Sequence, residues 1–257
     1  MNRIDKLFEK EKNGILSVYF TAGFPNLNDT VPIIQSLEKN GVKLIEIGIP
    51  FSDPMADGPV IQASGSKALQ NGMSLKLLFS QLSTVRKSVQ IPLVLMGYLN
   101  PIMQFGFDRF CAEAKRCGID GIIIPDLPFE DYLENYKSTA AAHGLHMIML
   151  ITPETSDERI RLIDKHTDGF IYMVSTASVT GAKSAFRDEN ISYFQRVNAM
   201  NLKNPRLIGF GISNKSTFDA ACDNASGAII GSKFVSLLES ERSIDKAVER
   251  LMEAIRD

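Results

Sequence analysis

Short runs of β-branched and other apolar residues recur along the 257-residue chain, and a segment with helical spacing separates each run from the next. There are eight such runs, at residues 16–23, 43–50, 91–98, 120–126, 146–152, 169–175, 206–213 and 227–232. Between them, segments such as 75–89 and 131–144 place apolar residues at i, i+3 and i+4, and Gly144 lies where a helix would end. Strands that are apolar almost throughout, joined by helices, predict a parallel sheet covered on its outer face.

Eight strand-helix units in a chain of this length predict a (β/α)₈ TIM barrel, an α/β fold that here forms a single domain over residues 1–257. The alternative is a doubly wound open sheet, which usually has a GxGxxG nucleotide fingerprint after its first strand. That fingerprint does not occur, and the first strand instead ends in the turn TAGFPN. No linker or low-complexity tract divides the chain.

The charge pattern argues against several classes of partner. Lys and Arg number 28 and Asp and Glu number 30, and no basic stripe alternates with aromatic residues, so we expect no nucleic-acid partner. No stretch of about 20 apolar residues is present and the N-terminus has no signal-peptide pattern, so we expect no membrane partner and a cytoplasmic protein. The three cysteines form no CxxC pair, and we predict no metal site.

Glu46 is an ionisable residue within the second apolar run, KLIEIGIP. Alternation along a strand puts Ile45 and Ile47 on one face, toward the helices, and turns Glu46 to the barrel interior. A buried carboxylate without a partner is costly, so this group should hold its proton more readily than in water, as an acid-base catalyst requires. The alternative is a structural ion pair with a lysine or arginine elsewhere in the core.

Position favours the catalytic interpretation, because barrel active sites form at the C-terminal ends of the strands and Glu46 lies near such an end. The loop that follows contains a second acid, Asp57, in the sequence MADGP, which could also be an ordinary turn residue. The long polar loop at 175–186 could be a connector, or it could close over a ligand.

Glycines at the ends of the last two strands suggest a phosphate site. Gly209 and Gly211 end the seventh run, and Gly231 with Ser232 ends the eighth, directly before the helical segment SKFVSLLES. Barrels commonly bind phosphate here through backbone N–H groups and a helix N-terminus. Glycine alone is a weak signal, since many turns between helices and strands contain it.

The motif IEIGIPFSDPMADGP closely resembles the signature of the tryptophan synthase alpha chain family. TAGFP, DLPFE, VTGA, GFGIS and IIGS follow the family pattern in order, and together the motifs span residues 15 to 235. The resemblance implies a lyase that cleaves indole-3-glycerol phosphate to indole and glyceraldehyde 3-phosphate by a retro-aldol reaction, in L-tryptophan biosynthesis. One departure is Ser178, where the family more often has glycine.

Carried over by position, the resemblance makes Glu46 the acid-base catalyst and Asp57 the group that interacts with the indole nitrogen. It implies that Thr180, Gly181, Gly211, Gly231 and Ser232 bind the phosphate or close the loop. Tyr172 matches a tyrosine of the indole pocket, and Tyr19 aligns with an aromatic position; core packing is the alternative for both tyrosines.

The resemblance also implies a beta-chain partner in an α₂β₂ heterotetramer. Pyridoxal phosphate is expected only on that beta chain, and no cofactor is expected on this one. Two segments expected as loops, 50–55 and 99–107, are apolar enough to contact a partner or to fold back onto the barrel. Two other functions stay open: a silent subunit that only activates its partner, and a different phosphate-handling barrel enzyme.

Overall fold

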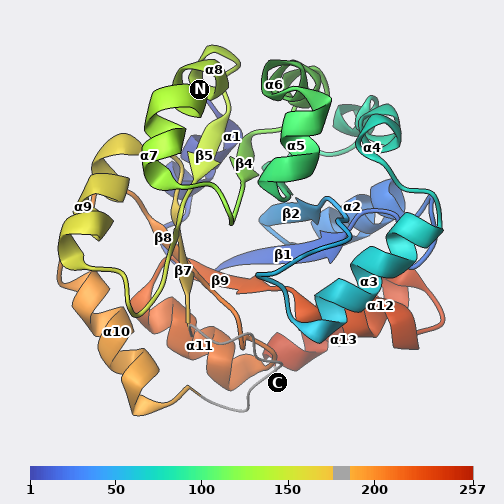
Figure 1. Cartoon of the computed structure of the whole chain (residues 1–257). Coiled ribbons are helices and arrows are strands. Elements are labelled where there is room, and N and C mark those ends of the chain that lie inside the picture. Colours follow the sequence, from blue (N-terminus) through green and yellow to red (C-terminus); the bar gives the residue numbers. More distant parts are fainter. Residues whose placement is uncertain (176–185, 257) are drawn as a thin grey trace.

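The centre of the molecule is a barrel of parallel strands with helices around it (Figure 1). The computed structural model describes residues 1–175 and 186–256. The sheet order is β5-β4-β3-β2-β1-β9-β8-β7-β6. The strands are β1 (Ile15–Thr21), β2 (Leu44–Gly48), β3 (Leu93–Met96), β4 (Gly121–Ile123), β5 (His146–Ile148), β6 (Leu150–Ile151), β7 (Ile171–Val174), β8 (Arg206–Gly209) and β9 (Gly227–Ile230).

The α/β barrel is confirmed, with one difference in the strand count. The run expected as the fifth strand, 146–152, is divided at Met149 into β5 and β6. β5 pairs only with β4, and β6 pairs with β7, so the division falls where the sheet closes on itself. The Tyr172 N–H donates to the Met149 carbonyl at 3.0 Å, which continues the bonding across the division.

Helices follow the strands and surround the barrel. The helices are α1 (Arg3–Lys10), α2 (Thr30–Lys39), α3 (Pro59–Gln70), α4 (Leu75–Leu82), α5 (Leu99–Phe105), α6 (Phe107–Arg116), α7 (Phe129–Asp131), α8 (Lys137–Ala142), α9 (Asp157–His166), α10 (Asp188–Asn198), α11 (Lys215–Asn224), α12 (Ser232–Ser240) and α13 (Ile244–Arg256), with the short turns η1 (Val85–Lys87) and η2 (Tyr132–Tyr136). Among the described residues, no helix is long and apolar enough to cross a membrane.

The segment predicted as one helix over 131–144 is continuous but not uniform, because a π turn, η2, lies between α7 and α8. Its end is as predicted. Gly144 has a φ of +72°, its N–H donates to Ala141, and the Leu145 N–H donates to Ala140. A left-handed glycine followed by this bond is the usual way to satisfy the last carbonyls of a helix.

Two separate apolar clusters form on the two faces of the strands. Ile45 and Ile47 of β2 belong to the larger cluster, between the sheet and the helices. Leu44 belongs to a smaller cluster inside the barrel, with residues from the other strands. α1 adds Ile4 and Phe8 to this inner cluster, so the N-terminal end of the barrel is filled by apolar side chains.

Candidate active site

Glu46 faces the barrel interior, as predicted from the alternation along β2. It pairs in register with Tyr19 of β1 on one side and Val94 of β3 on the other, and its side chain is fully buried. Gly48, two residues further along the same strand, is the next interior position. The rise of a strand puts Glu46 roughly 7 Å deeper in the barrel than Gly48.

Among the described residues, the surroundings of Glu46 offer its carboxyl one hydrogen bond. The Ser17 hydroxyl donates to Oε1 at 2.9 Å, and Oε2 is buried with no hydrogen-bond partner in this part of the chain. Within residues 1–175 and 186–256, no lysine, arginine or histidine forms an ion pair with Glu46. Burial raises the pKa of Glu46 to about 8, and the Ser17 bond offsets only part of this effect. The structural ion pair considered as an alternative is therefore not present in this part of the chain.

Asp57 lies in the loop between β2 and α3 and is partly buried. The Tyr98 hydroxyl donates to its Oδ2 at 3.0 Å and accepts the Ala56 N–H at 3.0 Å, so Tyr98 fixes both the carboxyl and the loop backbone. Burial raises the pKa of Asp57 to about 6, against the opposing effect of the Tyr98 bond. At neutral pH Asp57 is therefore ionised while most of Glu46 keeps its proton.

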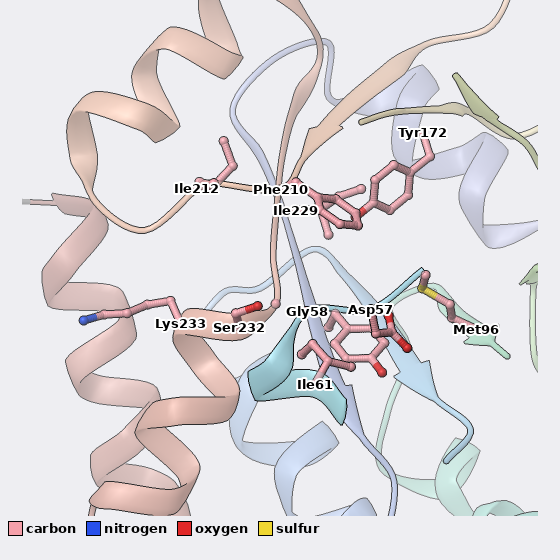
Figure 2. Close-up of a pocket in the computed structure, with 13 residues that line it drawn as sticks. Asp57, Gly58, Ile61, Met96, Tyr172, Phe210, Ile212, Ile229, Ser232 and Lys233 are labelled. Atoms are coloured by element: carbon pink, nitrogen blue, oxygen red, sulfur yellow. The ribbon is translucent and has the colours of Figure 1, made fainter. Parts of the chain in front are cut away.

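A cavity opens beside Asp57, with an empty volume of about 630 Å³ that includes the open solvent at its mouth. In Figure 2, Tyr172 and Phe210 lie on one side of this cavity, and Asp57 and Ile61 lie on the opposite side. The lining residues are Tyr19, Asp57, Gly58, Ile61, Met96, Tyr172, Phe210, Gly211, Ile212, Ile229, Gly231, Ser232 and Lys233. Glu46 is not among them, although Tyr19, with which it pairs in register, is.

Two glycines, which have no Cβ, leave room for the rings of Tyr19 and Tyr172. A Cβ on Gly48 would lie 2.1 Å from the Tyr19 hydroxyl oxygen, and a Cβ on Gly209 would lie 2.3 Å from that of Tyr172. Each tyrosine therefore lies over the backbone of the neighbouring strand. The Tyr172 ring also meets Phe210 nearly edge to face, with 6.2 Å between ring centroids. The result is a cavity with aromatic side chains in its wall.

The other end of the cavity is polar and formed by backbone. Gly211, Gly231 and Ser232 all line it, and α12 begins at Ser232. No side chain of the described residues caps α12, and its first internal bond runs from Val235 N to Gly231 O, so the earlier N–H groups have no partner within the helix. The Lys233 side chain points away from the other labelled residues (Figure 2). This end of the cavity suits an anion.

Phe210 has an unusual backbone, with a φ of +69°, and Gly211 follows with +81°. The Ser175 hydroxyl donates to the Phe210 carbonyl at 2.6 Å and holds this turn. Asn190 of α10 in turn donates to the Ser175 carbonyl at 2.6 Å. A left-handed conformation at a bulky residue costs free energy, so these bonds stabilise the position of Gly211 at the cavity.

The structure brings together seven of the nine residues predicted for the site: Glu46, Asp57, Tyr19, Tyr172, Gly211, Gly231 and Ser232. Thr180 and Gly181 lie outside the described residues. Sequence reasoning missed Ser17, Tyr98, Phe210, Met96 and Ile229. Alternation along the strands could have identified Met96 and Ile229 as interior residues, whereas no sequence signal marks Tyr98 or Ser17 as partners of the two acids.

The barrel, the buried acid and the cavity beside it are typical of a barrel enzyme and suit acid-base chemistry. The model of the family described as "Tryptophan synthase alpha chain" matches residues 5–257. The chain is 64% identical to the tryptophan synthase alpha chain of Parabacteroides distasonis and 62% identical to that of Phocaeicola vulgatus, over all of both chains in each case. It superposes on the alpha subunit crystal structure from Legionella pneumophila str. Paris with a TM-score of 0.89 at 35% identity, covering 100% of this chain and 97% of that one. The chain belongs to the tryptophan synthase alpha chain family, and it is a lyase of tryptophan biosynthesis.

Proposed function

We propose that the chain cleaves indole-3-glycerol phosphate with Glu46 as the proton donor and acceptor and Asp57 as the electrostatic stabiliser. The observation that supports this most strongly is the contrast between the two carboxyls. One is buried with a pKa of about 8 and the other is exposed to the cavity with a pKa of about 6. Two acids whose environments separate their pKa values can divide the roles of proton donor and fixed negative charge.

The reaction balances with these two groups alone. Glu46 gives its proton to the indole carbon that bears the glycerol chain, and positive charge develops at the ring nitrogen, where ionised Asp57 stabilises it. The Glu46 carboxylate then removes the proton of the neighbouring hydroxyl. The carbon-carbon bond breaks, its electrons return to the ring, and an aldehyde forms on the departing chain. Glu46 ends protonated, as it began.

The cavity supports this placement of the substrate. Tyr172, Phe210 and Tyr19 offer apolar faces to the indole ring, and the N-terminal end of α12 with Gly211 offers N–H groups to the phosphate. Because Glu46 is not part of the cavity wall, proton transfer requires its side chain to turn toward the bound ring. The three side-chain torsions of a glutamate permit such a movement.

The test is indole formation by the purified chain supplied with indole-3-glycerol phosphate, with and without added beta chain. The proposal predicts indole release by this chain alone, lost in Glu46→Gln and in Asp57→Asn. A silent activating subunit would raise the activity of the beta chain but would release no indole from this substrate under either condition.

We also propose that the chain docks on a tryptophan synthase beta chain in an α₂β₂ assembly, with pyridoxal phosphate held by the beta chain and no cofactor assigned to this one. A predominantly apolar groove lies between the loop after β2 and helices α4 and α5. Met55 and Met103, on the segments predicted for this contact, are 90% and 53% exposed. The prediction of a loop over 99–107 is wrong, since Met103 belongs to helix α5. Such exposed apolar side chains favour burial against a partner.

Docking is tested by titrating the beta chain into this chain by calorimetry. Met103→Glu should weaken the binding at least tenfold, because it puts a charge on the proposed interface. Leu162→Glu, at an exposed apolar residue on α9, is the matched control and should leave the affinity unchanged. Equal affinities for both variants would place the interface elsewhere.

A further inference from the structure

Ser17 is a fully buried polar residue inside the barrel, and neither the resemblance nor the sequence pattern gives it a role. It lies on β1 and pairs in register with Leu44 of β2 and Ile229 of β9, both apolar. A hydroxyl in such surroundings is costly unless it is hydrogen-bonded. Its observed bond is to Oε1 of Glu46, at 2.9 Å.

This bond makes the two oxygens of the Glu46 carboxyl unequal. Oε1 accepts the Ser17 proton, whereas Oε2 is buried and has no hydrogen-bond partner within the described part of the chain. In a neutral carboxyl one oxygen bears the proton and the other is a carbonyl that accepts hydrogen bonds. The oxygen already bound to a donor is the better carbonyl, so the proton belongs on the other oxygen.

We propose that Ser17 is a positioning residue for the reaction: its hydroxyl holds Oε1 of Glu46 and leaves Oε2 as the oxygen that bears the transferable proton. The proposal rests on the proposed function of Glu46. It adds that the orientation of the carboxyl, and its affinity for the proton, depend on a neighbouring strand. Ser17 needs no contact with the substrate for this role.

The other groups around Glu46 leave this role to Ser17. Tyr19 of β1 and Tyr172 of β7 are the titratable groups that interact with it electrostatically, and burial raises the pKa of both, so they are neutral at the pH of the reaction. Val94 of β3 and Leu207 of β8 are apolar members of the inner cluster. Asp57 lies at the cavity above and interacts with both tyrosines. Across residues 1–175 and 186–256, no cation is paired with the carboxyl.

Two variants of equal side-chain volume separate the effect of the hydroxyl group from the effect of a larger side chain. Ser17→Thr keeps the hydroxyl, and Ser17→Val replaces it with a methyl group. Infrared titration of the protonated carboxyl, identified as the band missing in Glu46→Gln, gives the pKa of Glu46 without any turnover. Losing a hydrogen bond to the charged form should raise this pKa by about one to two units in Ser17→Val, while Ser17→Thr stays close to the native protein.

The kinetic readout should follow the spectroscopic one. If protonated Glu46 starts the reaction, the fall of kcat/KM at high pH shifts upward in Ser17→Val by the same amount and stays in place in Ser17→Thr. Ser17→Ala provides the same comparison at smaller volume should the valine variant fail to fold, as judged by its thermal unfolding. A purely structural role would lower Tm and leave the titration in place.

The outcomes separate the two proposals. Equal Glu46 pKa values in Ser17→Val and Ser17→Thr, or in Ser17→Ala and the native protein, would overturn the role of Ser17. A Glu46 pKa that depends on the Ser17 hydroxyl, in a protein that releases no indole, would overturn the proposed function and leave the role of Ser17 in setting the carboxyl intact.

Discussion

Glu46 and Asp120 are both buried acids, but their surroundings are opposite. Asp120 lies directly before β4, at the N-terminal end of the barrel, and is 3% exposed. Arg86 and Arg3 form ion pairs with its two oxygens at 2.6 and 3.0 Å, and the Leu93 N–H donates to it at 3.0 Å. Glu46, inside the barrel, has one serine hydroxyl. Burial alone therefore does not identify a catalytic acid; the distinguishing feature is burial without compensation.

The comparison also divides the barrel by function. At the N-terminal end, Asp120 joins α1, β3 and the turn η1 that follows α4, since Arg3 belongs to α1, Leu93 to β3 and Arg86 to η1. Toward the C-terminal end, Oε2 of Glu46 has no partner among the described residues, and Asp57 lines a cavity. Stability at one end and reactivity at the other are the usual arrangement in barrel enzymes.

The largest effect is expected from Glu46→Gln, which keeps the shape and removes the exchangeable proton. Turnover should fall by roughly a hundredfold to ten-thousandfold, equivalent to about 3 to 5 kcal/mol, with little change in KM. Steady-state assays of indole release measure both. Turnover near the native value would show that Glu46 is no more reactive than Asp120.

The reciprocal change, Asp120→Asn, should affect stability instead of catalysis. Two arginines would lose their charged partner, and we expect a loss of about 3 kcal/mol in the free energy of unfolding, measured by urea denaturation. Turnover of the folded variant should stay within about twofold of the native value. A loss of turnover as large as in Glu46→Gln would contradict the distinction between a structural Asp120 and a catalytic Glu46.

Glu46→Gln should also be more stable than the native protein, by an amount that depends on pH. The pKa of Glu46 is raised from 4.5 to about 8 on folding, so the folded state binds this proton more tightly than the unfolded state. Native stability therefore falls as pH rises through this window, whereas glutamine cannot ionise. The difference should grow by about 1.4 kcal/mol per pH unit and level off above pH 8. Denaturation at a series of pH values measures it, and a constant difference would argue against an uncompensated carboxyl.

The smallest effect concerns the other acid of the site. Tyr98→Phe removes the hydroxyl that donates to Asp57, so the pKa of Asp57 should rise by about one unit above its present value of about 6. The rise of kcat/KM at low pH should move upward by the same amount, with about a tenfold loss below pH 6. The high-pH side of the profile is the internal control, because it depends on Glu46 and should not move.

The sequence predicted the parts of this structure that depend on local periodicity. Alternation along β2 correctly predicted that Glu46 faces the barrel interior, and Gly144 correctly predicted the end of a helix. The division of the fifth strand at Met149 was not visible, because residues 147–151, MIMLI, are apolar throughout and the interruption arises from closure of the barrel. The residue pattern of one strand does not show where a closed sheet is interrupted.

Partners distant in sequence were beyond the same reasoning. Ser17 and Glu46 are 29 residues apart, and Tyr98 and Asp57 are 41 apart, so only the folded barrel brings the members of each pair together. No sequence pattern marked Asp120 as a buried acid, although it is almost as buried as Glu46. Whether a buried acid is compensated is decided by these long-range contacts, and the sequence alone left that question open.

The pH dependence of kcat/KM for indole release tests the central claim most directly, because it reports both acids in the free enzyme. With Asp57 required ionised and Glu46 required protonated, the profile should be bell-shaped, with limbs near the pKa values of about 6 and about 8. A rate that stays level well above pH 8, or that already declines near the ordinary glutamate pKa of 4.5, would show that Glu46 does not hold the proton that starts the reaction.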